Sequence, residues 1–354
     1  MCTILSLAAT HLSILRPGTP RYSRAALSLL TKSAQLFREQ LSRPMTPENC
    51  DALMGTSILM QYLSWCNLGF LEDQHSSVSG LDLSQDQLFV LSSGVQHIFF
   101  EALPFFLRSR SVFMSVAVYR PIVSIEDVVR QHGKSPEELV SLFMRLWDDP
   151  RYQDKDTPNG GAANSSGVTE ESAYCCQETV ALSGSHPEAA DMLRAREVLR
   201  GIVSSATTSH HLSTAASASH SAASASYTRV FPRTPREAFE RATRSLAIIL
   251  SVSQLSAAGR AAAMQHDLER YYFSFPIVLG YLFSFPTVLG GPLFSLSRAG
   301  DTRALVVLFH FYHSGRILLT SPGSWWARQR SQVLEKLILK ELKSRGLGVC
   351  SRHC

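Results

Sequence analysis

The sequence predicts an all-α fold, built as an irregular multi-helix domain that disordered insertions interrupt. Helix-start signals recur along the chain, and the apolar residues that follow them return at spacings of three and four. No segment alternates apolar and polar residues as a half-buried strand does. With 354 residues, 45% of them hydrophobic, the chain can also bury a sizeable core, which excludes wholesale disorder.

Several helix starts match the capping-box pattern. In a capping box, the N-cap hydroxyl accepts a hydrogen bond from the third backbone amide, and a Glu or Gln side chain accepts one from the N-cap amide. The boxes begin at Ser84, Ser135, Ser185 and Thr234. Three of them place a proline in the first turn, where its missing N–H costs nothing. Residues 46–48 predict a weaker start. The apolar helices predicted after these signals include residues 51–70, 87–107 and 238–255.

Two segments depart from the helical pattern. Residues 151–184 are rich in Asp, Asn, Gly, Ser and Thr, and residues 204–227 consist almost entirely of Ser, Ala, Thr and His. Neither can bury enough apolar area to offset the entropy of ordering it, so both are predicted to be disordered and to be cut first by proteases. A short helix at 188–202 between them has an apolar face that can dock on the core.

The domain organisation predicted from these patterns is simple. An N-terminal segment, 1–21, precedes a helical domain, 22–345, that contains both insertions, and a short tail, 346–354, follows. The apolar start of the chain lacks the positive residues of a signal peptide.

An uncharged stretch between Arg270 and Arg298 exceeds the ~20 residues that a transmembrane helix needs. Prolines and glycines interrupt it about every five residues, and freed backbone groups are costly in lipid. We therefore predict no membrane span. The stretch contains a near-tandem repeat, at 273–280 and 283–290, which we interpret as a local duplication within a loop or a broken helix.

Catalytic motifs are absent from the sequence. There is no HExxH, GxSxG, Walker loop or GxGxxG between a strand and a helix. The chain is therefore predicted not to be an enzyme and to hold no cofactor. The net charge of +5 is a mild surplus, too diffuse to indicate nucleic-acid binding by itself. The cysteines are seven in number and scattered, which favours free thiols in a reducing compartment, with Cys50 and Cys66 packed as small hydrophobes.

Two histidines are candidate metal ligands, but their surroundings disfavour a metal site. His310 and His313 share a narrow polar stripe with Arg303 on the predicted helix 302–314, and no Cys, Asp or Glu stands within a turn of them. We expect the histidines to reach the surface or to bond a neighbour. The helix is predicted to have Asp301 as its N-cap and to stop at Gly315.

Several sequence blocks resemble the C-terminal regulatory region of fungal zinc-cluster transcription factors, particularly the sterol uptake control protein type. The blocks are YSRAAL (22–27), DALMGTSILM (51–60), LSW (63–65), DQLFVLSSGV (86–95), FPIVL (275–279), RAGDTRALVVLFHFY (298–312) and the Trp325 and Trp326 pair. Their order and spacing carry the resemblance, which covers most of the chain outside residues 151–227.

The resemblance implies a helical regulatory domain that senses an effector and acts in RNA polymerase II transcription. A helical core rich in aromatic residues can hold an apolar pocket for a small lipophilic ligand such as a sterol, although such residues are more often plain core. Candidate apolar ligand-binding residues are Met60, Leu63, Trp65, Phe89, Phe99, Phe309 and Tyr312. Ser64 or Ser92 is expected to bond a single ligand hydroxyl. Expected partners are the transcription machinery or family members, and the expected location is the nucleus, or the cytoplasm in an unliganded or repressed state.

The chain departs from this family at the DNA-binding element. A binuclear zinc cluster needs six cysteines in two groups led by CxxC, and no CxxC occurs in this sequence. We therefore expect no metal site and no sequence-specific DNA binding by this chain. Either the DNA-binding segment was lost or the sequence begins downstream of it. The alternative hypothesis is a stand-alone interaction protein that dimerises with intact family members and modulates them.

Overall fold

The computed structural model describes residues 1–71, 81–108, 111–113, 121–153, 234–256, 258–260, 277–288 and 292–347. Every regular element in these ranges is a helix, and none of the described residues belongs to a strand. The all-α prediction is confirmed. The proposed helix at 188–202, the insertion 204–227 and nearly all of the insertion 151–184 lie outside the described residues, as does most of the C-terminal tail.

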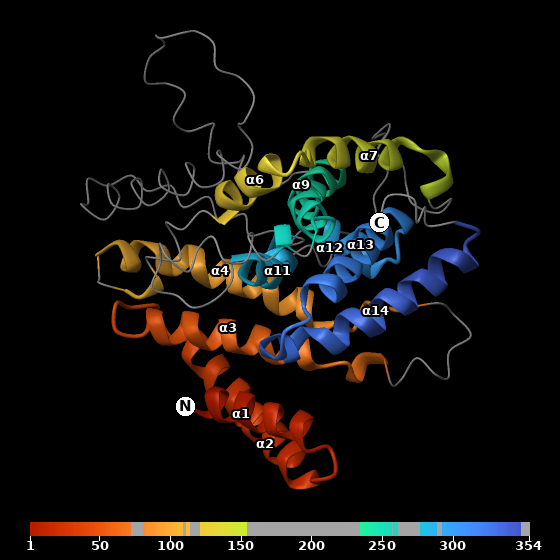
Figure 1. Cartoon of the computed structure of the whole chain (residues 1–354). Coiled ribbons are helices and arrows are strands. Elements are labelled where there is room, and N and C mark those ends of the chain that lie inside the picture. The colour runs from red at the N-terminus through yellow and green to blue at the C-terminus, as the bar shows by residue number, and fades with distance from the viewer. Residues whose placement is uncertain are drawn as a thin grey trace, which may run out of the picture.

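The helices form pairs that stack from one end of the molecule to the other (Figure 1). The first pairs are α1 (Cys2–Leu15) with α2 (Pro20–Leu41) and α3 (Cys50–Cys66) with α4 (Gln87–Arg108). Next come α6 (Pro121–Gln131), α7 (Pro136–Asp148), the short η2 (Pro150–Tyr152) and α9 (Pro235–Ser253). The chain then forms α11 (Ile277–Val288), α12 (Pro292–Arg298), α13 (Thr302–Leu318), the short η4 (Pro322–Ser324) and α14 (Trp325–Ser344).

Helix α9 is the centre of the main hydrophobic core. It contacts α6, α7, α11, α12 and α13, and every residue from Leu246 to Ser253 is buried. A helix that is buried on all sides near its end indicates a core of more than two layers. A second, smaller cluster lies between α3 and α4 and contains Cys50, which is fully buried as expected of a thiol that packs as a hydrophobe.

Two predicted helix starts are confirmed. At Thr234 the complete capping box is present, because the Glu237 amide donates to Thr234 Oγ1 over 3.2 Å and the Thr234 amide donates to Glu237 Oε2 over 3.4 Å. Helix α7 begins at Pro136 after Ser135, as predicted, but the Ser135 hydroxyl donates to the Glu137 carboxylate instead of capping the helix.

At two other starts the predicted caps are wrong, although α4 begins at Gln87 and α3 at Cys50, where the apolar runs predicted helices at 87 and 51. The Ser84 amide and hydroxyl are both engaged by Asp82, at 2.7 and 3.0 Å, so the cap of α4 passes to Asp86, which accepts the Leu88 amide at 3.0 Å. The start predicted at 46–48 falls at Cys50 instead, because the Thr46 amide donates to the Asn49 side chain in a turn that precedes α3. Ser185 lies outside the described residues.

Helix α13 begins as predicted and ends later. Asp301 caps it by accepting the Arg303 and Ala304 amides at 2.9 and 3.2 Å. The stop predicted at Gly315 is wrong, since α13 continues to Leu318. The glycine instead permits close packing with α14, because a Cβ atom at this position would lie 2.7 Å from the Ser331 hydroxyl oxygen. The polar stripe is also less exposed than expected, since Arg303 is buried.

Arg303 is held below the surface by two interactions. Its guanidinium pairs with Asp301, with an Nη2 to Oδ2 distance of 2.6 Å, and it lies 4.1 Å from the centroid of the Trp147 ring. An arginine over an indole face gains cation–π attraction that increases when water is excluded. This pair therefore joins the start of α13 to the end of α7.

Among the described residues, one helix is long and apolar enough to cross a membrane by length and composition. It is α4, over Gln87–Phe106, with a mean hydropathy of 1.3. This is weak evidence for a span, because the core helix of a globular protein passes the same test, and 39% of the segment is buried here. The stretch in which a span was considered, between Arg270 and Arg298, contributes α11 and α12, and the second repeat copy enters α11.

Candidate functional site

The predicted apolar ligand-binding residues are packed in the protein interior. Trp65, Phe89, Phe309 and Tyr312 belong to the main core, and Met60 and Leu63 are also buried. Phe99 packs instead against the second cluster, between α3 and α4. The Trp65 ring lies 5.1 Å from the Trp326 ring and 5.9 Å from the Phe311 ring. The structure therefore surrounds these aromatics with other side chains and does not gather all of them around one space.

The two serines predicted to bond a ligand already donate their protons to backbone carbonyls. The Ser92 hydroxyl donates to the Leu88 carbonyl over 2.6 Å and accepts from the buried Gln61 side chain over 2.9 Å. The Ser64 hydroxyl donates to the Gln61 carbonyl over 2.7 Å. Each hydroxyl keeps lone-pair capacity, so it can still accept a hydrogen bond but not readily donate one.

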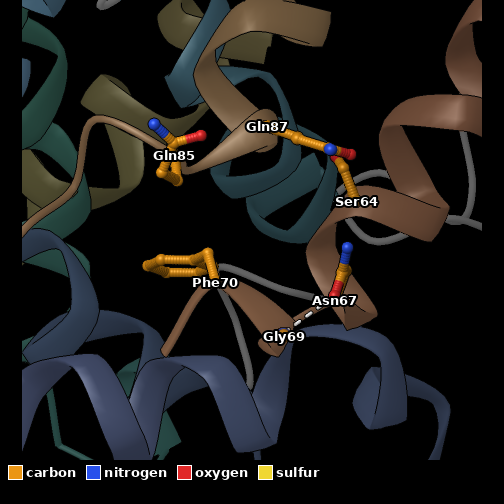
Figure 2. A pocket seen from close by; sticks show the side chains of 6 residues that line it. All are labelled: Ser64, Asn67, Gly69, Phe70, Gln85 and Gln87. Carbon is orange, nitrogen blue, oxygen red and sulfur yellow. Dashed lines mark hydrogen bonds between the residues drawn. The ribbon is translucent and has the colours of Figure 1, made fainter. Parts of the chain in front are cut away.

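Ser64, one of the predicted site residues, borders a cavity in the described part of the chain. This cavity, which we call the carboxamide cavity, has a volume of about 360 Å³ and lies where α3 ends and α4 begins. Its lining residues are Ser64, Asn67, Gly69, Phe70, Gln85 and Gln87 (Figure 2). Three carboxamides and a hydroxyl surround a single aromatic ring, so the lining is more polar than the sequence predicted.

The side chains of the carboxamide cavity have defined directions. The Asn67 side-chain oxygen accepts the Gly69 amide over 2.9 Å, and Figure 2 shows the Asn67 amide nitrogen pointing into the cavity. The Gln87 side chain reaches across toward Ser64 in the same view. None of the lining side chains titrates near neutral pH, so the cavity offers hydrogen bonds and a stacking surface for a neutral molecule.

A buried arginine holds the wall of this cavity together. Arg330 of α14 has no exposed side-chain surface, and its guanidinium pairs with Asp86, which is also buried. One guanidinium nitrogen donates to the Ser64 and Asn67 carbonyls over 3.0 and 2.8 Å. These carbonyls belong to the end of α3, where Arg330 adds a donor to the Ser64 carbonyl, which also accepts the Asn67 amide over 3.2 Å, and supplies one to the Asn67 carbonyl.

The remaining contacts of Arg330 extend the network to two more parts of the fold. Its Nε donates to the Tyr312 hydroxyl of α13 over 3.4 Å, and burial raises the pKa of Tyr312 to about 12. The Phe70 ring, which lines the cavity, lies 5.4 Å from the Arg330 guanidinium carbon. The network therefore connects α3, α4, α13 and α14 directly beside the carboxamide cavity.

Sequence reasoning missed Arg330 and the three carboxamides. One signal for Arg330 exists: it stands four residues after Trp326 and four before Leu334, on the face of α14 that is buried. A cation at such a position needs a buried partner, because a lone charge is costly to desolvate. The carboxamides carry no comparable signal, since neutral polar residues near helix ends are usually solvated.

The two histidines of α13 have different surroundings. His313 Nδ1 lies 2.8 Å from Glu335 Oε1, which confirms that it bonds a neighbour, and no group of three metal-ligating residues occurs among the described residues. The His310 ring packs edge-on against Phe143 of α7, with ring centroids 5.3 Å apart. Burial, with a contribution from the nearby His313, lowers the pKa of His310 to about 4.

His310 should make the folded protein sensitive to mild acid. The pKa of His310 is about 4 in the folded state and 6.5 in the unfolded state. Its contribution to the free energy of unfolding is therefore complete above pH 6.5 and is lost as the pH falls toward 4. At pH 5 we expect this residue alone to cost about 2 kcal/mol of unfolding free energy relative to pH 7. Urea denaturation of the wild type and of His310→Leu at both pH values measures the difference.

The matched control is His97→Gln, because His97 is exposed and, among the described residues, pairs with Glu101 on its own helix, α4. This variant should keep nearly the wild-type loss of stability between pH 7 and pH 5. An equally large loss in His310→Leu would contradict the assignment of the acid sensitivity to His310.

Comparisons of the whole chain with family models, curated proteins and solved structures give no significant match.

Proposed function

We propose that this chain is the effector-sensing regulatory domain of a transcription regulator of the fungal zinc-cluster type, and that the carboxamide cavity binds the effector. The observation that carries the proposal is the junction of this cavity with the Arg330 network. Ser64 and Asn67 line the cavity with their side chains and hold Arg330 with their carbonyls. A ligand that moves the end of α3 therefore acts on Arg330 of α14, which also engages Asp86 at the start of α4 and Tyr312 of α13.

The sequence resemblance supports the same location. Ser64 lies in the LSW block and Gln87 in the DQLFVLSSGV block, two of the segments that resemble the regulatory region of these transcription factors. The all-α fold agrees with the helical regulatory domain that the resemblance implies. The transcriptional role and the nuclear location remain proposals.

The lining of the cavity favours a small neutral ligand that carries a ring and several hydrogen-bonding groups. Phe70 offers a stacking surface, and the carboxamides of Asn67, Gln85 and Gln87 both donate and accept. A sterol gains most of its affinity from burying apolar area, at ~25 cal/mol per Å², and one ring among six lining residues offers little of it. The sterol prediction therefore requires the aromatic core to open, and the experiment below includes it.

A thermal-shift experiment on the full chain tests the proposal with two panels: sterols, and neutral heterocycles such as free nucleobases and nucleosides. A ligand at a hundred times its Kd stabilises the native state by about 2.7 kcal/mol, which raises Tm by a few degrees. We expect a shift with members of the second panel and its loss in Asn67→Ala and Gln87→Ala. Both residues are exposed, so the Tm of the free protein should change little, with the larger change in Asn67→Ala, which loses the hydrogen bond from the Gly69 amide.

Gln329→Ala is the matched control, because Gln329 is an exposed carboxamide on α14 that does not line the cavity. The same ligand should also change reporter transcription when the chain is fused to an unrelated DNA-binding domain. If sterols raise Tm in the wild type and equally in both cavity variants, the ligand site lies in the aromatic core and not in the carboxamide cavity. No shift with either panel would contradict effector sensing and favour the stand-alone interaction protein.

A further inference from the structure

Helix α1 has its polar face inside and its apolar face outside. Its buried residues are Thr3, Ser6 and Ala9, and these face α2. The Ser6 hydroxyl donates to the Ala26 carbonyl over 2.9 Å, and the Thr3 hydroxyl bonds that of Ser33. Small residues and interhelical hydrogen bonds let two helices approach closely, and here they leave the large aliphatic side chains of α1 pointing away from the pair.

Exposed aliphatic side chains are concentrated on this hairpin. Nine of the twelve large hydrophobic residues exposed in the described part of the chain lie in residues 1–41, and α1 itself carries no charged side chain. The nine are Met1, Ile4, Leu5, Leu12, Ile14, Leu15, Leu27, Leu36 and Leu41. Scattered exposed leucines are ordinary on a protein surface, but a cluster of this kind marks an interaction surface.

The positive charge of the protein is concentrated on the same hairpin. Residues 1–45 contain six Lys and Arg residues and one acidic residue, Glu39, so they account for the whole net charge of +5, and the rest of the chain holds 28 of each sign. The surplus is therefore concentrated and not diffuse, so the prediction of a diffuse charge is wrong. The exposed cations of α2 are Arg21, Arg24, Lys32 and Arg38.

The position of the hairpin leaves this surface accessible in the described structure. Helices α1 and α2 lie at one end of the molecule, beyond α3 (Figure 1). Helix α1 contacts α3, and its His11 ring stacks on the Trp325 ring of α14, with centroids 4.4 Å apart. Ile4, Leu5 and Leu12 remain 40–53% exposed despite this contact.

We propose that the α1–α2 hairpin docks on the surface of an anionic lipid bilayer. The aliphatic face of α1 enters the boundary between headgroups and acyl chains, and the cations of α2 contact the acidic headgroups, as in other basic amphipathic helices. Helix α1, with 14 residues, is shorter than the ~20 that a span requires, so the hairpin lies on the membrane and does not cross it.

The positive charge of the hairpin favours an acidic bilayer over a second copy of the chain as the partner of the aliphatic face. Pairing two hairpins through their aliphatic faces would bring together two regions that each carry a net charge of +5. Like charges disfavour such a dimer, whereas an acidic lipid surface attracts the same residues. The inference does not depend on the proposed ligand of the carboxamide cavity, which is tested without vesicles.

Co-sedimentation of the full chain with lipid vesicles tests the docking surface. The vesicles are either phosphatidylcholine alone or three parts phosphatidylcholine to one part phosphatidylserine. We expect binding to the anionic vesicles, much weaker binding to the neutral ones, and a loss of binding as salt is raised, because the Debye length falls from about 10 Å at 0.1 M to about 3 Å at 1 M.

Two double variants separate the apolar contribution from the charged one. Leu5→Ser with Leu12→Ser should weaken binding by roughly tenfold per leucine, and Arg24→Gln with Lys32→Gln by roughly fivefold per cation. Leu142→Ser is the matched control, because Leu142 is an exposed leucine on α7, away from the hairpin, and its loss should leave binding unchanged. Circular dichroism and Tm confirm that each variant is folded.

The proposal fails if the wild type does not bind anionic vesicles, or if the control weakens binding as much as the hairpin variants do. It also fails if the wild type is a dimer that the leucine variants dissociate while vesicle binding is absent, which would assign the face to a second copy. Binding that requires an acidic protein partner and not lipid would likewise overturn it.

Discussion

Replacing Arg330 with methionine is expected to lower the free energy of unfolding by about 3–5 kcal/mol. The variant leaves the Asp86 carboxylate buried without its cation and leaves the Ser64 and Asn67 carbonyls without the donor they have now. The unpaired buried charge is the main cost, because the Ser64 carbonyl still accepts the Asn67 amide over 3.2 Å. Urea denaturation at pH 7, followed by circular dichroism, measures the loss.

A double-mutant cycle identifies the cause of this loss. Asp86→Asn removes the charge while the side-chain oxygen can still accept the Leu88 amide, so the cap of α4 is preserved. Combined with Arg330→Met, it should destabilise the protein by clearly less than the sum of the two single variants. Arg244→Met, at an exposed pair with Glu240 on α9, is expected to cost less than about 1 kcal/mol. Additive losses at Arg330 and Asp86 would contradict the buried-pair explanation.

Replacing Trp65 with alanine is expected to cost about 3–5 kcal/mol and to destabilise the fold whether or not a ligand is present. The ring is 1% exposed and contacts Trp326 and Phe311, so its removal leaves a large space in the centre of the core. Phe309→Ala should behave alike, because Phe309 belongs to the same core. Thermal and urea denaturation of the free protein measure both.

The matched variant is Trp65→Phe. The indole Nε1 of Trp65 is buried and has no hydrogen-bond partner among the described residues, which is a cost that phenylalanine does not carry. We therefore expect Trp65→Phe to lose no more than about 2 kcal/mol. If Trp65→Ala instead kept the stability of the free protein and lost only a ligand-induced rise in Tm, Trp65 would belong to a ligand pocket and not to the core.

The sequence predicted the helical class of the fold because the signals for helices are local. At Thr234 the hydroxyl, the proline and the glutamate of the capping box lie within four residues, and all act as predicted. Where two local signals compete, the prediction shifts. Asp82 engages Ser84 and moves the cap of α4 to Asp86, and Gly315 proved to serve the contact with α14 and not the end of its helix.

The candidate site was less predictable because it depends on contacts between distant segments. Ser64 was predicted, but its neighbours at the cavity are neutral polar residues whose sequence pattern matches that of any solvated turn. Trp65 and Phe309 show the complementary difficulty. Aromatic residues at helical spacing look the same in a sequence whether they fill a core or line a pocket, and the packing around them decides between the two.

The capping of α3 by Arg330 also has a consequence for the order in which the protein folds. Ser64 and Arg330 are 266 residues apart, and α14 follows every other described helix in the sequence. During synthesis, the Ser64 and Asn67 carbonyls lack the Arg330 guanidinium until α14 leaves the ribosome, and until then water solvates the Asn67 carbonyl. The wall of the carboxamide cavity is therefore complete only after α14 has been translated. Nascent chains that stop earlier should not bind the ligand, even if their first helices have already formed.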